Sequence, residues 1–130
     1  MRAHLADEGI DLPLDTIVEP APDGPLAAPV RIGSHLEGGN RFAILPMEGW
    51  DGTTDGLPTP DLERRWLRFG ASGAGLLWGE ATAVVPEGRA NPNQLMINEE
   101  TAERLGSLRS RTVEARALEF DGPRLITGMQ

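Results

Sequence analysis

A short apolar run that ends at a proline constrains the fold of this chain more than any other feature. Residues 42–45 read Phe-Ala-Ile-Leu and lie between polar Asn40-Arg41 and Pro46. An uninterrupted apolar run of this length is typical of a strand buried on both faces, as in a parallel sheet. Proline has no amide hydrogen to give a neighbouring strand, so the strand ends at Pro46. The loop over residues 47–59 then lies at the carboxyl end of a strand, where α/β proteins bind their ligands.

Two further apolar segments alternate with helical patterns along the chain. Residues 60–69 predict a helix capped by Thr59, and residues 74–79 predict a second strand. A second helix is expected from a cap at Asn98, and residues 125–129 predict a third strand. The order strand, helix, strand, helix, strand implies right-handed crossovers and a parallel sheet, either open or closed into a barrel.

The part of the chain before the first strand has a different character. Residues 19–29 hold four prolines and predict an extended connector, whereas residues 30–39 predict a small hairpin of the kind that closes one end of a barrel. We therefore expect an extended, proline-rich segment over residues 1–29 and an α/β domain over residues 30–130. At 130 residues the chain is much shorter than a complete (β/α)8 barrel.

Composition excludes several classes of function. The chain has 20 acidic and 12 basic residues and a net charge of -8, which argues against nucleic acid or an anionic membrane as a partner. It has no cysteine, and no stretch approaches the length of a membrane span, so we expect a cytoplasmic protein. His4 and His35 lie outside the strand-end loops and receive no catalytic role. Asp51 and Asp55 are explained by turn formation, so no metal site is expected.

Four motifs in order along residues 30–130 resemble the Old Yellow Enzyme family of FMN-dependent oxidoreductases. They are Asn-Arg-Phe-Ala-Ile-Leu-Pro-Met at 40–47, Gly-Leu-Pro-Thr at 56–59, the run from Gly73 to Val84, and Pro-Glu-Gly-Arg at 86–89. The resemblance implies the amino-terminal part of a (β/α)8 TIM barrel, about three parallel βα units preceded by a hairpin and truncated after strand three. It also implies a parent enzyme, an FMN-dependent NAD(P)H:acceptor oxidoreductase that reduces activated alkenes or related small-molecule acceptors by hydride transfer through the flavin.

The resemblance implies cofactor contacts at the ends of all three strands. Pro46, Met47 and Glu48 would run along the flavin ring, Ala81 would approach its pyrimidine side, and Gln130 would bond to it. Such an arrangement suits a ring that is apolar on its faces and polar at its border. Glu48 departs from the family, which usually has threonine, serine or cysteine at this position.

Other side chains receive more local interpretations. Trp50 is expected over the substrate pocket, with core packing as the alternative, while Trp66 and Trp78 are assigned to the core. Glu80 is expected to make a structural hydrogen bond at the strand end rather than to act as a base. Arg89 is expected to form a salt bridge with a neighbouring loop rather than to approach a partner subunit.

In the family, the histidine that binds the substrate carbonyl together with an asparagine or a second histidine comes from later strands. The tyrosine proton donor and the arginines that hold the phosphate and the flavin do so too, and no catalytic residue is therefore assigned here. We therefore expect residues 1–130 alone to hold the ring weakly and to be inactive, and the full-length parent to form a homo-oligomer. Two alternatives stay open. One is another FMN-binding or phosphate-binding barrel enzyme, such as an isomerase or aldolase, and the other is a non-catalytic barrel remnant.

Overall fold

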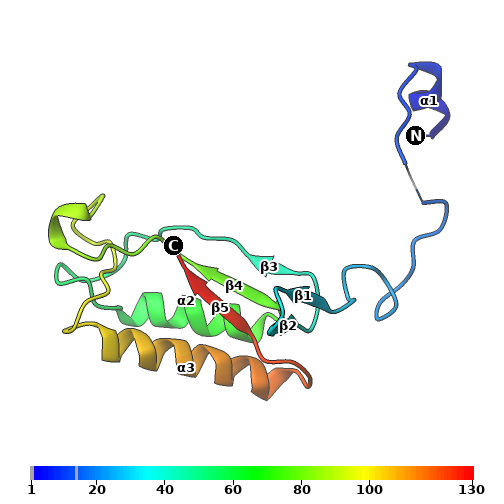
Figure 1. Cartoon of the computed structure of the whole chain (residues 1–130). Coiled ribbons are helices and arrows are strands. Elements are labelled where there is room, and N and C mark those ends of the chain that lie inside the picture. The colour runs from blue at the N-terminus through cyan, green and yellow to red at the C-terminus, as the bar shows by residue number, and fades with distance from the viewer. Residues whose placement is uncertain (1, 14) are drawn as a thin grey trace.

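Three parallel strands lie on two helices in the computed structural model, which describes residues 2–13 and 15–130 (Figure 1). The sheet has the order β3-β4-β5, and the helices α2 and α3 follow β3 and β4 in the chain. Both strand pairs are parallel, so the alternation and the parallel sheet expected from the sequence are confirmed. The bounds are β3 (Ala43–Ile44), α2 (Pro60–Ala71), β4 (Leu76–Gly79), α3 (Ala102–Glu119) and β5 (Ile126–Met129).

The remaining elements are short. A helix α1 (Arg2–Asp7) begins the chain, and Figure 1 shows the segment before β1 running away from the sheet and its helices. The strands β1 (Val30–Ile32) and β2 (Leu36–Gly38) form the expected antiparallel hairpin, and η1 (Pro86–Gly88) is a single 3₁₀ turn. Across residues 2–13 and 15–130, no helix is both long and apolar enough to cross a membrane.

The two long helices begin in different ways. Thr59 caps α2 as expected, because its hydroxyl oxygen accepts a hydrogen bond from the Leu62 amide at 3.3 Å and Pro60 occupies the first turn. The expected cap of α3 is displaced. The Asn98 side chain accepts from the Glu100 and Thr101 amides in a turn that precedes the helix, and α3 itself begins at Ala102.

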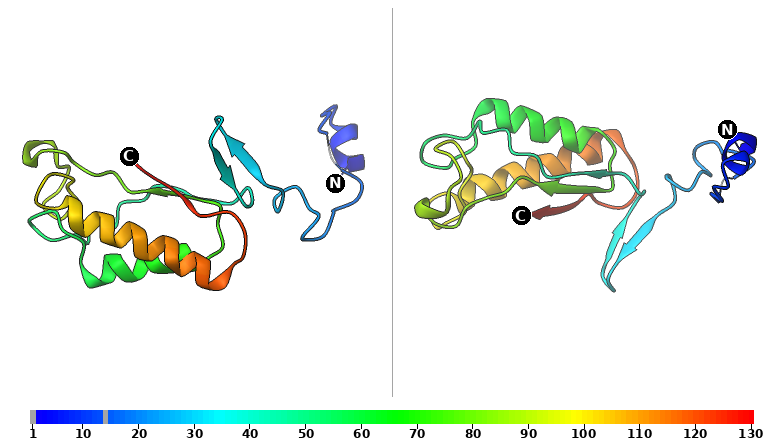
Figure 2. Two further views of the ribbon diagram at one scale, coloured as in Figure 1. Left: turned by 60° about the horizontal axis from the view of Figure 1, so that its bottom comes forward. Right: turned by 90° about the horizontal axis from the view of Figure 1, so that it is seen from above.

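Figure 2 shows α2 and α3 on the same side of the strands, and the hydrophobic core lies between these helices and that face of the sheet. The two helices approach closely at Gly70, where an added Cβ would lie 2.2 Å from the Thr112 carbonyl oxygen. No larger residue fits there without separating α2 from α3. The core cluster consists of Leu62, Trp66, Leu77, Leu95, Leu105, Leu108, Val113 and Leu125.

The opposite face of the sheet is open to solvent, which corrects two expectations. Residues 42–45 are not buried on both faces, since Phe42 is exposed and Leu45 is 74% exposed. Trp78 is not a core residue, because it is 41% exposed. The cause is alternation along the strands: Leu77 faces the helices, so its neighbour Trp78 faces the uncovered side, where it lies against Gly128.

Candidate functional site

The loops that follow the three strands enclose a hollow of about 440 Å³. Its lining includes five of the six side chains that the sequence assigned to the flavin and the substrate. Met47 is the exception, because it is 81% exposed and does not line the hollow. The structure thus brings these residues together, while their roles as ligands stay predictions. The full lining is Pro46, Glu48, Trp50, Ala81, Ala90 and Gln130.

Two connections between loops hold the walls of this hollow in place. The Thr82 amide donates to the carbonyl oxygen of Gln130 at 2.8 Å, which joins the loop after β4 to the end of β5. The side chain of buried Gln94 accepts from the Ala90 amide at 2.6 Å and donates to the Ala81 carbonyl at 3.2 Å. Gln94 therefore fixes the distance between two lining residues. No sequence pattern pointed to Gln94, because a glutamine inside a long loop has no characteristic spacing.

Glu80 is the centre of a buried network at the end of β4. Its carboxylate is 5% exposed and accepts from Arg65 Nη2 at 2.6 Å, from the indole Nε1 of Trp66 at 3.2 Å and from the Gly49 amide at 3.4 Å. These three donors satisfy the hydrogen-bonding capacity of the buried carboxylate from within the chain. The expected structural role of Glu80 is thus seen in the structure.

Arg65 connects this network to the loop after β3. Its Nη1 atom lies 2.7 Å from the Asp51 carboxylate, so Asp51 forms an ion pair and does not serve merely as a turn residue. Gly49 passes so close to the guanidinium that an added Cβ would lie 1.8 Å from Arg65 Nη1. A larger residue at position 49 would therefore displace the Arg65 guanidinium from its place beside the loop. Sequence reasoning missed Arg65, because its partners are distant in the chain.

Glu48 and Trp50 interact directly at the rim of the hollow. The indole Nε1 of Trp50 donates to the Glu48 carboxylate at 2.6 Å. Trp50 is 61% exposed, which does not fit core packing, and its backbone has a φ of 51°. Non-glycine residues rarely adopt this left-handed conformation, and it occurs preferentially at functional positions.

Arg89 contacts the neighbouring loop, as expected, but it forms no salt bridge there. Its guanidinium donates to the carbonyl oxygens of Thr54 at 2.6 Å and Thr53 at 3.1 Å, in the loop after β3. It also donates to the carbonyls of Pro92 and Gln94 within its own loop. The partners are backbone carbonyls and not carboxylates, so the expectation of a salt bridge was wrong. Arg89 nevertheless joins the loops after β3 and β4.

The hollow fits the ring of a flavin better than it fits the phosphate. Its volume falls in the range of roughly 300–1,000 Å³ that is usual for cofactor and ligand sites. Its walls combine apolar side chains with the amide of Gln130, which suits a flat ring with a polar border. Glu48 is the only charged residue among the lining, so no cation is present there to bind a phosphate.

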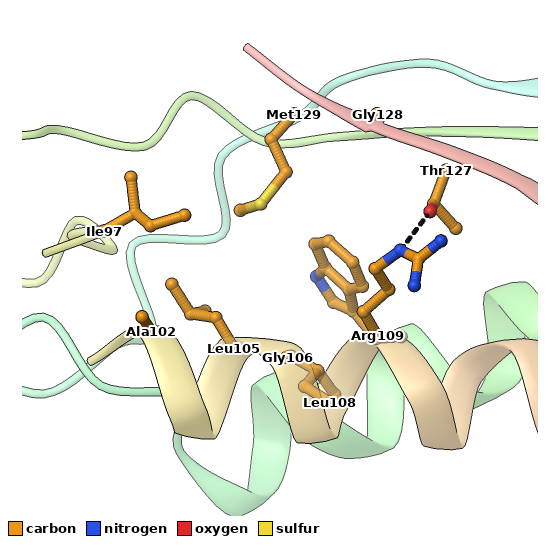
Figure 3. A pocket seen from close by; sticks show the side chains of 10 residues that line it. Ile97, Ala102, Leu105, Gly106, Leu108, Arg109, Thr127, Gly128 and Met129 are labelled. Carbon is orange, nitrogen blue, oxygen red and sulfur yellow. Dashed lines mark hydrogen bonds between the residues drawn. The ribbon is translucent and has the colours of Figure 1, made fainter. Parts of the chain in front are cut away.

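A second cavity of about 250 Å³ lies between α3 and β5, on the helix side of the sheet (Figure 3). Figure 3 shows Leu105 and Met129 pointing into it, and Arg109 Nε donates to the Thr127 hydroxyl at 2.8 Å on one side. None of the residues predicted to bind the flavin lines this cavity. It is therefore distinct from the strand-end hollow.

Comparison with known proteins finds matches among solved structures only. No protein-family model and no curated protein matches the sequence. Solved structures do match: an Old Yellow Enzyme homologue from Zymomonas mobilis has a TM-score of 0.61 and 25% identity, over 69% of this chain and 25% of that one. Old Yellow Enzyme from Pichia sp. AKU4542 has a TM-score of 0.64 and 24% identity, over 85% of this chain and 27% of that one. Morphinone reductase in complex with tetrahydroNAD has a TM-score of 0.57 and 25% identity, over 82% of this chain and 27% of that one.

The chain spans about a quarter of the length of these solved proteins. Its parallel strands and helices match a part of their barrel, which confirms the fold class expected from the sequence. The four sequence motifs resemble the Old Yellow Enzyme family, and the chain is similar in fold to one part of the TIM barrel of the solved Old Yellow Enzyme homologues.

Proposed function

We propose that this chain provides the ring-binding part of an FMN-dependent oxidoreductase, in which hydride passes from a nicotinamide nucleotide through the flavin to a small activated alkene or related acceptor. One observation carries the proposal: Pro46, Glu48, Trp50, Ala81 and Gln130 were assigned from sequence alone and line a single hollow. The complex of morphinone reductase with tetrahydroNAD supports a nicotinamide as the electron donor.

Each lining residue has a physical task in this proposal. Pro46 has no amide hydrogen and offers the ring only its carbonyl group and its apolar ring. Ala81 is small, so a flat ring can lie against the backbone at the end of β4. The Gln130 side chain can both donate to and accept from the polar border of the ring. Bound FMN would supply the redox chemistry, while these residues bind the ring and orient it.

Flavin titration tests the proposal. We would follow flavin fluorescence while adding the chain to FMN and, separately, to lumiflavin, which has the same ring without the ribityl phosphate. Because no cation lines the hollow, the two flavins should bind with similar, weak affinity. Ala81→Leu should weaken both by about tenfold, since the larger side chain occupies the ring's position. Ala117→Leu, on the exposed side of α3, is the matched control and should change the affinity for neither flavin.

Absence of saturable binding by either flavin would refute the proposed function. So would equal binding by the Ala81→Leu variant, because the hollow would then not be the binding site. Binding of FMN but not of lumiflavin would favour the alternative of a phosphate-binding barrel protein, since the phosphate would then supply the affinity.

A further inference from the structure

We propose that Glu48 is a positioning residue that fixes the indole of Trp50 at the rim of the hollow, and that the pair favours uncharged aromatic or alkene ligands over carboxylate-bearing ones. The inference deepens the proposed function, because it assigns a ligand class to the same site. It rests on contacts within this chain and needs no bound cofactor for its test.

The hydrogen bond between the two side chains is short and charge-assisted. The indole nitrogen of tryptophan can only donate, and the Glu48 carboxylate accepts from it at 2.6 Å. Glu48 and Trp50 are separated only by Gly49, and this hydrogen bond links their side chains directly. A neutral or shorter residue at position 48 would give the indole a weaker acceptor or none.

The backbone on both sides of Trp50 is already held, so the side-chain torsions are its main remaining freedom. The Gly49 amide donates to Glu80 at 3.4 Å, and Asp51 pairs with Arg65 at 2.7 Å. The Gly52 amide donates to the Asn93 carbonyl at 3.0 Å. Trp50 itself is exposed, has a φ of 51° and lines the hollow. The bond to Glu48 restricts the rotation that these backbone contacts leave free.

The charge of the rim follows from the same geometry. Glu48 is the only charged residue that lines the hollow. Two arginines near these loops are engaged elsewhere, because Arg65 of α2 pairs with Asp51 and Glu80, and Arg89 bonds to backbone carbonyls. A ligand that enters the hollow therefore meets an uncompensated negative charge beside an aromatic face. This arrangement repels a carboxylate and accepts a neutral flat molecule.

Indole NMR of the flavin-free chain tests the positioning. Three tryptophans give three indole N–H peaks, and Trp50→Phe identifies the one from residue 50. Loss of the carboxylate acceptor in Glu48→Gln should move this peak upfield and leave those of Trp66 and Trp78 in place. Glu87→Gln, an exposed carboxylate on η1, is the matched control and should move none. A Trp50 peak at the same position in the wild-type chain and in Glu48→Gln overturns the proposal.

Two isosteric probes test the ligand class on the same samples. Benzamide and benzoate differ in charge but hardly in shape, and binding of each is followed through the Trp50 indole peak. We expect the wild-type chain to bind benzamide more tightly, and the ratio of the two dissociation constants to fall by about tenfold in Glu48→Gln. An unchanged ratio, or benzoate bound as tightly as benzamide by the wild-type chain, overturns the selectivity. Because no flavin is present, these results are independent of the flavin titration that tests the proposed function.

Discussion

The two ends of the three-stranded sheet each hold a buried charged side chain, and the two side chains differ in their hydrogen-bond partners. At the carboxyl end, the carboxylate of Glu80 has three hydrogen-bond donors from two different segments. At the amino end, Arg116 of α3 is 4% exposed, yet its Nε and Nη1 atoms have no hydrogen-bond partner in the described part of the chain. Its guanidinium instead lies 5.5 Å from the centre of the Phe120 ring.

The difference lies in how much of each charged group is bonded by other residues of the chain. Arg65 of α2 supplies the counter-charge of Glu80, so this carboxylate is held before any ligand arrives. Arg116 is stabilised by the face of Phe120 and by the negative end of the α3 dipole, which together are weaker than direct hydrogen bonds. Within the described residues, Arg116 keeps two buried nitrogens without a partner, whereas at the carboxyl end Asp51 and Arg65 each keep one such atom beside the bonds that they make.

Removing the Glu80 carboxylate should have the largest effect. Glu80→Leu leaves the Trp66 indole without an acceptor and Arg65 with Asp51 alone. Breaking a buried ion pair by deleting one partner typically costs about 3 kcal/mol or more of unfolding free energy. Urea denaturation measures the loss, and Glu87→Leu, which removes an exposed carboxylate, is the control. Equal stability of the two variants would mean that the network at the carboxyl end is not stabilising.

Removing the buried cation at the other end should have the opposite sign. Arg116→Met keeps an unbranched side chain against Phe120 but deletes two unbonded guanidinium nitrogens. We expect the unfolding free energy to rise by about 1–2 kcal/mol, because a buried unsatisfied polar group is costly. Arg109→Met, at an exposed arginine on the same helix, is the control. A fall in stability would show that Arg116 finds a partner in solution, and the contrast between the two ends would then disappear.

Gln94 allows a finer test of the carboxyl end. Gln94→Leu deletes the two hydrogen bonds that link Ala81 to Ala90, at a cost of about 1 kcal/mol in unfolding free energy. Because both alanines line the hollow, lumiflavin should bind more weakly to this variant than its small loss of stability suggests. Gln94→Glu retains one acceptor, so its affinity for lumiflavin should lie between those of the wild-type chain and Gln94→Leu. Unaltered lumiflavin binding in Gln94→Leu would mean that the hollow keeps its shape without this bridge.

The smallest change in stability is expected on the open face of the sheet. Leu45 is exposed there, so Leu45→Ser should alter the unfolding free energy by less than about 0.5 kcal/mol. The same substitution should reduce concentration-dependent association, because exposed apolar strands promote contacts between molecules. Sedimentation velocity over a range of concentrations measures this effect. Leu77→Ser, on the helix-covered face, should instead unfold the chain, and similar behaviour of both variants would contradict the assignment of the two faces.

The sequence predicted the succession of elements well because local signals determine it. Thr59 and Pro60 specify the start of α2, and the apolar run before Pro46 specifies the first strand of the parallel sheet. Burial was harder to predict. Strands of a barrel are apolar on both faces, so the composition of residues 76–79 could not reveal that Trp78 faces solvent.

The candidate site divides along similar lines. Five of the six lining residues were assigned through the resemblance to the Old Yellow Enzyme family, and they come together because the carboxyl ends of parallel strands meet at one edge of the sheet. The supporting contacts could not be found in this way. Arg65 reaches Glu80 and Asp51 from the middle of a helix, and Gln94 acts from the middle of a loop. Such pairs depend on tertiary geometry, which a single sequence does not encode in its spacing.

The origin of the hollow in three distant segments has a consequence for folding kinetics. Leu76 pairs with Ala43 on one side and with Ile126 on the other, so both strand pairings close long loops. Such non-local pairing is slow, and the hollow exists only after Gln130 has docked beside the loop after β4. A ligand that binds only the complete hollow therefore stabilises the chain with Gln130 docked. At a hundred times its dissociation constant it would raise the unfolding free energy by about 2.7 kcal/mol, so ring binding and completion of the fold become one linked equilibrium.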